Sequence, residues 1–114
     1  MTISIVTGGA GFIGSHIVEK LKRLDHMVVV IDNEYSDNDN FHWRKDTLNV
    51  NLDITDYKGL KKAFTGADYI FHCAAEARIG PAIKNPINAL NINTIGTCNV
   101  LQCAREVGAK KVLY

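Results

Sequence analysis

The chain of 114 residues has little of what marks a membrane, secreted or nucleic-acid-binding protein. No apolar run approaches the roughly 20 residues that cross a bilayer, and the N-terminus lacks the basic flank and cleavage site of a signal peptide. Thirteen basic and twelve acidic side chains nearly cancel, so no overall field attracts nucleic acid or an anionic membrane. We therefore expect a cytoplasmic protein that captures its ligand at a local site.

Cysteine and proline are also scarce. Cys73, Cys98 and Cys103 have no paired spacing and lie in apolar stretches, which predicts free, buried thiols. The four histidines are scattered without an HExxH or CxxC frame, so we expect no metal site. With two prolines, nine glycines and 46% apolar residues, the composition favours one packed domain over residues 1–114.

Short apolar runs alternate with amphipathic segments along the chain. Strands are expected at 3–7, 27–31, 48–52, 69–72 and 111–114, and helices at 12–24, 56–64 and 86–106. The near-continuous apolar strand 27–31 is typical of a parallel sheet that is covered on both faces. We predict an α/β fold, a Rossmann-type doubly wound parallel sheet of five strands in the order 3-2-1-4-5, truncated after the fifth strand.

Local signals refine three of these segments. Helical spacing places Ile13, Ile17, Leu21 and Leu24 on one face of the first helix, which we expect to be buried. Thr55 is the candidate N-cap of the second helix. The polar residues 33–47 predict a long surface loop.

The strongest signal is a glycine-rich turn between the first strand and the first helix. The segment Gly8-Gly-Ala-Gly-Phe-Ile-Gly14 contains both a GxGxxG and a GxxGxxG pattern. The early glycines let the backbone approach a pyrophosphate, whose charge the helix N-terminus stabilises, and Gly14 allows close packing of helix on strand. This arrangement predicts a dinucleotide site.

Asp32 strengthens that prediction, because it ends the second strand 18 residues after Gly14. A carboxylate there accepts hydrogen bonds from an adenosine ribose. It would repel a 2′-phosphate, and no Arg or Lys occurs between Asp32 and Arg44 to offset that repulsion. We therefore expect NAD as the cofactor, with NADP as the less favoured alternative.

Five motifs in order along the chain carry a resemblance to a known family. They are Thr7-Gly-Gly-Ala-Gly-Phe-Ile-Gly-Ser15, Ile31-Asp-Asn33, Leu52-Asp-Ile-Thr55, His72-Cys-Ala-Ala75 and Asn93-Thr-Ile-Gly-Thr97. Together they make the chain similar to extended short-chain dehydrogenases/reductases, specifically the nucleotide-sugar epimerases and dehydratases, and segment 77–86 resembles that of UDP-glucose 4-epimerase relatives. The resemblance implies an NAD-dependent enzyme of nucleotide sugars.

The resemblance also implies roles for individual residues. The pyrophosphate would be held by the glycine turn, the adenosine ribose by the end of the second strand, the adenine by the end of the third, and the nicotinamide-side ribose by the end of the fourth. The residues concerned are, in that order, Gly8, Gly11, Phe12, Ile13 and Gly14; Asp32 and Asn33; Asp53 and Ile54; Ala74, Ala75 and Glu76. Asn93 would reach toward the cofactor from the long helix.

Two departures from the family matter. Ala82 stands where many relatives have Ser, and residues 1–114 do not include the catalytic Ser or Thr, the Tyr-x-x-x-Lys pair or the substrate domain of the relatives. Tyr57 and Lys61 match the spacing of that pair, but they lie in the helix before the fourth strand, where the family has no catalytic residues. We therefore expect no catalytic residue in this chain and no activity from it alone.

Other segments leave alternatives open. The aromatic and basic residues 41–45 are suited to stacking on a nucleic acid or an adenine, or to packing Trp43 on the sheet edge. Glu76 and Arg78 would face a sugar diphosphate, or else lie in solvent or in an ion pair. We expect structural roles for His16 and His72.

Three hypotheses for the whole chain remain. It is the NAD-binding portion of a nucleotide-sugar epimerase or dehydratase, a free-standing dinucleotide-binding module or partner subunit, or a structural protein that never binds NAD. The last hypothesis does not explain why the glycine turn and Asp32 occur together.

The edge of the fifth strand and the long helix predict self-association. We expect an uncovered apolar stripe formed by Ile87, Leu90, Thr94, Leu101 and Ala104. A homodimer or higher oligomer would cover it.

Overall fold

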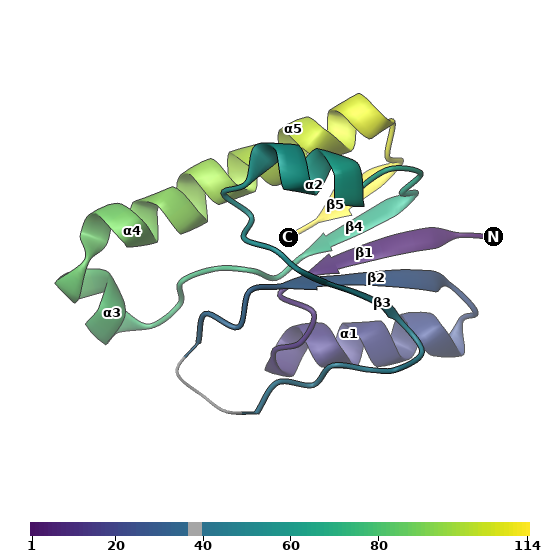
Figure 1. Ribbon diagram of the computed structural model, residues 1–114, viewed down its shortest axis with the longest axis horizontal. Helices are drawn as coiled ribbons and strands as arrows, with labels where there is room; N and C mark the ends of the chain where they lie inside the picture. The colour runs from purple at the N-terminus through teal and green to yellow at the C-terminus, as the bar shows by residue number, and fades with distance from the viewer. Residues whose placement is uncertain (37–39) are drawn as a thin grey trace.

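The computed structural model describes residues 1–36 and 40–114, which form helices packed on both faces of a five-stranded sheet (Figure 1). The strands are β1 (Ile3–Thr7), β2 (Met27–Asp32), β3 (Leu48–Asn51), β4 (Tyr69–His72) and β5 (Lys111–Leu113). They pair in parallel in the order β3-β2-β1-β4-β5, which confirms the predicted topology. Every strand therefore ends at the same edge of the sheet.

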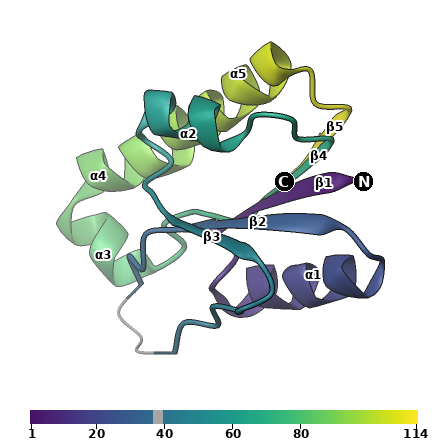
Figure 2. The same cartoon turned by 45° about the vertical axis from the view of Figure 1, so that its right-hand side comes forward.

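The two faces of the sheet are covered by different helices. Helix α1 (Phe12–Arg23) lies on one face, and α2 (Tyr57–Ala63) and α5 (Thr97–Val107) lie on the other (Figure 2). Each face has its own core: Val30 belongs to the cluster under α1, and its neighbour Val29 belongs to the cluster under α2 and α5. Because successive strand residues point to opposite faces, a sheet covered on both sides needs an unbroken apolar strand.

Helix α1 buries only part of the face that we predicted: Leu21 is buried and Ile17 packs against the core cluster under α1, but Ile13 and Leu24 are not covered. Ile13 is 67% exposed and Leu24 is 56% exposed, whereas Gly14, Val18 and Leu21 face the sheet. The turn decides this outcome, since Gly14 is pressed against the backbone of the glycine turn and fixes the rotation of the helix about its axis. Periodicity alone does not distinguish this stripe from the adjacent one.

The long helix is continuous but not uniformly α-helical. Helix α4 (Pro86–Leu90) leads into a π-helical segment, η1 (Asn91–Gly96), which leads into α5. A Cβ atom at Gly96 would lie 2.5 Å from Cδ1 of Ile54, so a glycine there lets the helix approach the segment after β3 closely. The short helix α3 (Ile79–Lys84) precedes this run and was not predicted, because Gly80 and Pro81 in its first turn are read as turn residues.

Three smaller predictions also need correction. Asp56, not Thr55, caps α2 by accepting from the backbone N–H of Gly59 at 3.0 Å.

All three thiols are free, but Cys98 is exposed on the outer side of α5 and only Cys103 is fully buried. Ala104 is buried against the sheet rather than lying on an uncovered stripe, because it faces the same side of α5 as Cys103 and Val100.

The expected surface loop 33–47 contains neither helix nor strand in its described parts, 33–36 and 40–47, while residues 37–39 lie outside the described residues. Trp43 packs against the core cluster under α1 and donates to Glu34 at 2.7 Å. Within the described part of the chain, no helix is long and apolar enough to cross a membrane.

Candidate functional site

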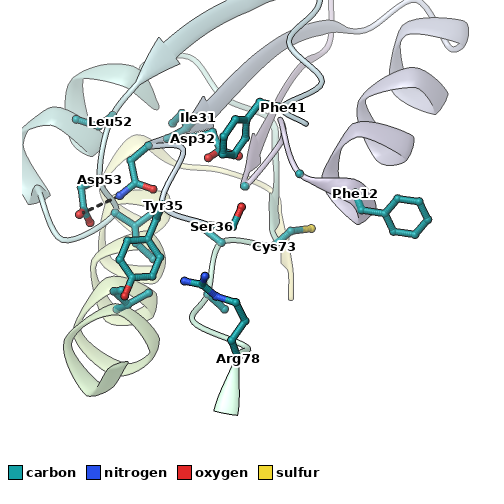
Figure 3. Close-up of a pocket in the computed structure, with 17 residues that line it drawn as sticks. Phe12, Ile31, Asp32, Tyr35, Ser36, Phe41, Leu52, Asp53, Cys73 and Arg78 are labelled. Atoms are coloured by element: carbon teal, nitrogen blue, oxygen red, sulfur yellow. Dashed lines mark hydrogen bonds between the residues drawn. The ribbon is translucent and has the colours of Figure 1, made fainter. Parts of the chain in front are cut away.

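A cavity of about 360 Å³ opens at the carboxyl ends of β1 to β4, where Figure 3 shows its lining side chains converging. Its walls come from the glycine turn, the end of β2, the segments that follow β2, β3 and β4, and two helical residues, Phe12 and Ile92. The lining residues are Gly8, Gly11, Phe12, Ile31, Asp32, Asn33, Tyr35, Ser36, Phe41, Leu52, Asp53, Ile54, Cys73, Ala74, Ala75, Arg78 and Ile92. Ligands of open parallel sheets bind at this edge.

The glycine turn is as tight as its sequence predicts. Gly8 has a φ of +66°, which L side chains rarely adopt, and a Cβ atom there would lie 2.8 Å from the backbone nitrogen of Ala74. A Cβ atom at Gly14 would overlap the carbonyl oxygen of Gly8. Gly8 and Gly11 therefore form the cavity floor, whereas Gly14 and the exposed Ile13 lie outside the cavity lining.

Asp32 organises the wall next to that turn. One carboxylate oxygen accepts from the backbone N–H of Ala10 at 3.1 Å, and the other accepts from that of Glu34 at 2.9 Å. The next residue, Asn33, donates from its amide to Asp53 at 3.2 Å, which links the ends of β2 and β3 (Figure 3). Asp32 therefore presents a carboxylate to the cavity from a position that two backbone donors fix.

A hydrogen-bond chain below the cavity fixes the end of β4. The Thr7 hydroxyl accepts from the backbone N–H groups of Cys73 and Ala74, at 3.1 and 3.2 Å. Because these two bonds occupy its lone pairs, the Thr7 hydroxyl donates its own proton to Nδ1 of His72 at 2.6 Å. The ring proton of His72 is therefore on Nε2, which donates to the Thr97 hydroxyl at 3.0 Å. Burial lowers the pKa of His72, which agrees with a neutral ring.

Glu76 and Arg78 form an ion pair behind the cavity wall. The Glu76 side chain is 1% exposed and accepts from Nε and Nη2 of Arg78, each at 3.1 Å. This pairing, more than any other contact, lowers the pKa of the Glu76 carboxyl. Of the two alternatives for these residues, the structure shows the ion pair, and it places only Arg78 in the cavity lining.

Asn93 does not line the cavity. Its amide oxygen accepts from the backbone N–H of Glu76 at 2.8 Å, and its amide nitrogen donates to the Glu76 carbonyl at 3.0 Å. The amide thus closes both backbone groups of one residue, which makes Asn93 a support of the cavity wall. Its neighbour Ile92 takes the lining position that we expected for Asn93.

Most of the predicted site residues converge on the cavity. They are Gly8, Gly11, Phe12, Asp32, Asn33, Asp53, Ile54, Ala74 and Ala75. Ile13, Gly14, Glu76 and Asn93 lie outside its lining. Sequence reasoning missed Tyr35 and Ser36, although their position just after β2 is a usable signal, because residues that follow parallel strands meet at one sheet edge. Phe41, from the segment 41–45 for which stacking on an adenine was one alternative, also lines the cavity.

The Tyr57–Lys61 pair is remote from this cavity, on the surface of α2. The Tyr57 hydroxyl donates to the carboxylate of Glu106, and Lys61 lies 3.2 Å from the same carboxylate. The hydrogen bond to Glu106 raises the pKa of Tyr57 to about 12. A general base needs a lowered pKa, so this pair joins α2 to α5 and is unsuited to acid–base catalysis.

The described residues contain no group of three or more His, Cys, Asp or Glu side chains that could hold a metal ion.

The parallel sheet, the glycine turn and the cavity at the strand ends define an α/β protein of the Rossmann type. Residues 4–114 match the NAD dependent epimerase/dehydratase family, and the chain belongs to that family. The resemblance found in the sequence is thereby confirmed. A UDP-glucuronic acid decarboxylase from Danio rerio is 36% identical over 111 residues, which cover 96% of this chain and 26% of the relative.

Other similar proteins are also UDP-sugar decarboxylases and epimerases. A UDP-N-acetyl-alpha-D-glucosaminuronate decarboxylase from Bacillus cytotoxicus is 34% identical, and the match covers 96% of this chain and 35% of the relative. UDP-glucose 4-epimerase from Thermotoga maritima, solved with UDP-glucose, superposes with a TM-score of 0.91 at 33% identity and covers 97% of this chain and 36% of the other. The Thermus thermophilus UDP-glucose 4-epimerase, solved with NAD, superposes with a TM-score of 0.88 at 32% identity. The match covers 99% of this chain and 37% of the other. This chain therefore spans about a quarter to a third of its relatives' length.

Proposed function

We propose that this chain binds NAD in the cavity at the carboxyl ends of its strands. The observation that carries the proposal is the convergence of the glycine turn and Asp32 on one cavity of about 360 Å³. That volume falls within the roughly 300–1,000 Å³ of small-molecule sites. Membership of an NAD-dependent family and the solved NAD complex of the similar Thermus thermophilus epimerase support it.

The chemistry of the lining suggests how the dinucleotide would lie. The pyrophosphate would lie over Gly8 and Gly11, where no side chain intervenes and the N-terminus of α1 carries partial positive charge. The adenosine ribose would hydrogen-bond to Asp32 and the adenine would lie between Asp53 and Ile54, while Ala74 and Ala75 would leave room for the nicotinamide-side ribose. The fixed carboxylate of Asp32 favours NAD over NADP, since a 2′-phosphate would meet a negative charge.

We propose further that NAD binding serves chemistry on a nucleotide sugar. The similar Thermotoga maritima epimerase was solved with UDP-glucose, and the relatives from Danio rerio and Bacillus cytotoxicus are decarboxylases of UDP-sugars. In such chemistry NAD accepts a hydride from a sugar carbon and later returns it. Residues 1–114 contribute cofactor binding, and groups outside them are required for acid–base steps.

A free-standing dinucleotide-binding module or partner subunit is the alternative reading of the same cavity. In that case the chain would bind NAD with the same residues but would act on no sugar.

Isothermal titration calorimetry tests NAD binding, which both hypotheses share. We expect NAD to bind with 1:1 stoichiometry and Gly11→Val to abolish binding, because the valine side chain would occupy the floor over which the pyrophosphate lies. Gly80→Val is the matched control, since Gly80 lies outside the cavity and an added Cβ atom there meets no atom within 4 Å. Absence of heat and saturation at millimolar NAD would refute the proposal.

A further inference from the structure

Three segments that are distant in sequence meet at the mouth of the cavity. Tyr35 comes from the segment after β2, Arg78 from the segment after β4, and Asn88 from α4. The guanidinium carbon of Arg78 lies 5.4 Å from the centre of the Tyr35 ring, and Figure 3 shows the guanidinium turned toward that ring. Asn88 donates its amide to the Tyr35 hydroxyl at 2.8 Å. Tyr35 therefore contacts both of the other segments.

Two sets of hydrogen bonds hold this group together. Asn88 donates to the Tyr35 hydroxyl, and the Glu76 carboxylate, which favours the protonated hydroxyl, raises the pKa of Tyr35. The same carboxylate accepts from Arg78. Each group is thus used as a donor or an acceptor in the sense that its chemistry requires.

The anchor of the group is rigid, whereas its outer part opens easily. Glu76 is buried, and Asn93 holds its backbone by both the N–H and the carbonyl. Tyr35, in contrast, is 38% exposed, so water can replace its partners when it swings out. A contact between an exposed residue and a fixed one joins two walls reversibly.

We propose that Tyr35, Arg78 and Asn88 form a clasp across the cavity mouth, and that these positioning residues slow the dissociation of the bound dinucleotide. The inference rests on the proposed function. Tyr35 and Arg78 both line the cavity, from the segments that follow β2 and β4 on either side of β1, so their contact bridges the two walls between which the dinucleotide would lie. Asn88 does not line the cavity and acts through Tyr35.

Stopped-flow displacement of NADH by excess NAD measures this dissociation directly, through the fluorescence of NADH. In Asn88→Ala, loss of one hydrogen bond at the clasp is expected to speed dissociation about fivefold, with little change in the association rate. Tyr35→Phe keeps the ring over Arg78 but loses the hydroxyl, and it should act in the same direction. Asn91→Ala is the matched control, because Asn91 is exposed on the same helical run and its side chain makes no hydrogen bond within the described part of the chain.

The double variant separates a clasp from general loosening. Tyr35→Phe and Asn88→Ala break the same hydrogen bond, so together they should be no faster than the quicker single variant. Unchanged dissociation in Asn88→Ala and Tyr35→Phe, or an equal acceleration in Asn91→Ala, would overturn the clasp. Failure of the unsubstituted protein to bind NADH or NAD would instead overturn the proposed function.

Discussion

At the residue scale, the site depends on two glycines, whose lack of a side chain allows close backbone contacts, and on one threonine hydroxyl. Gly8 adopts a left-handed conformation beneath Ala74, and Gly14 lets α1 press against the turn. The Thr7 hydroxyl then holds the backbone of Cys73 and Ala74 in register with that turn. One small polar side chain and two missing side chains thus set the distance between the cavity floor and its β4 wall.

Gly14→Ala tests how closely the helix and turn are packed. We expect a loss of about 1–3 kcal/mol in the free energy of unfolding, because the new methyl group meets backbone atoms of Gly8 and Gly9 that cannot rotate away. Urea denaturation measures the loss. Gly80→Ala is the control: with open space around the added methyl group and a place inside α3, it should leave stability equal or higher by up to about 1 kcal/mol. Equal stability of the two variants would contradict the close-packing argument.

At the element scale, α2 and α5 are joined by a polar contact outside the core. Glu106 of α5 accepts from the Tyr57 hydroxyl and from Gln102, and it pairs with Lys61 of α2. These bonds, led by that of Tyr57, lower the pKa of Glu106 to about 2. The residues that match the spacing of a catalytic pair therefore serve to hold one helix on another.

This contact predicts a dependence of stability on pH. The pKa of Glu106 in the folded state lies below its ordinary value of 4.5, so its contribution is present above about pH 4.5 and is lost as the pH falls toward 2. Glu106→Gln should be less stable than the unsubstituted protein at pH 7, by a small amount because the groups are exposed, and the difference should vanish near pH 2. Urea unfolding between pH 2 and 7 measures it.

Glu19→Gln controls for the loss of one surface carboxylate, since Glu19 pairs with Arg23 on α1. A Glu106→Gln difference that is constant across the pH range would show that the contact does not stabilise the fold.

At the scale of the whole molecule, apolar surface remains uncovered on the helical run and at the sheet edge. Ile87 is 72% exposed, Leu90 61% and Leu101 47%, and Thr94 is exposed beside them. In the described residues β5 pairs only with β4, so its other edge carries unpaired backbone groups. Burial of this surface stabilises an assembly by about 25 cal/mol per Å² of apolar area.

We therefore propose that the protein forms a homodimer or higher oligomer. Light scattering at about 100 µM should give at least twice the monomer mass of 12.6 kDa. Leu101→Glu should shift the population toward monomer, because a charge would be buried in the contact. Leu24→Glu, on the exposed side of the α1 end, is the control and should leave the mass unchanged. A 12.6 kDa species from the unsubstituted protein would refute this proposal.

The order and direction of the strands, the glycine turn and the position of Asp32 could be predicted from the amino-acid pattern alone. These features rest on local chemistry: alternation of apolar runs and helical periods, the φ that glycine tolerates, and the handedness of crossovers. The glycine turn and the strand and helix patterns can be evaluated within a few neighbouring residues, and the fixed handedness of crossovers then restricts the strand order. For that reason the predicted floor of the cavity and most of its wall, from Gly8 to Ala75, agree with the structure.

Which side chains face one another across the cavity depends instead on how the helices and strands pack together. Asn93 supports the Glu76 backbone, Ile92 takes its place in the lining, and Tyr35 meets Asn88 from 53 residues away. The close packing of α1 at Gly14 and of the long helical run at Gly96 likewise depends on contacts with Gly8 and Ile54. Such pairings depend on how two elements are rotated and spaced after they pack, and that rotation is fixed by side-chain volumes that belong to neither element alone.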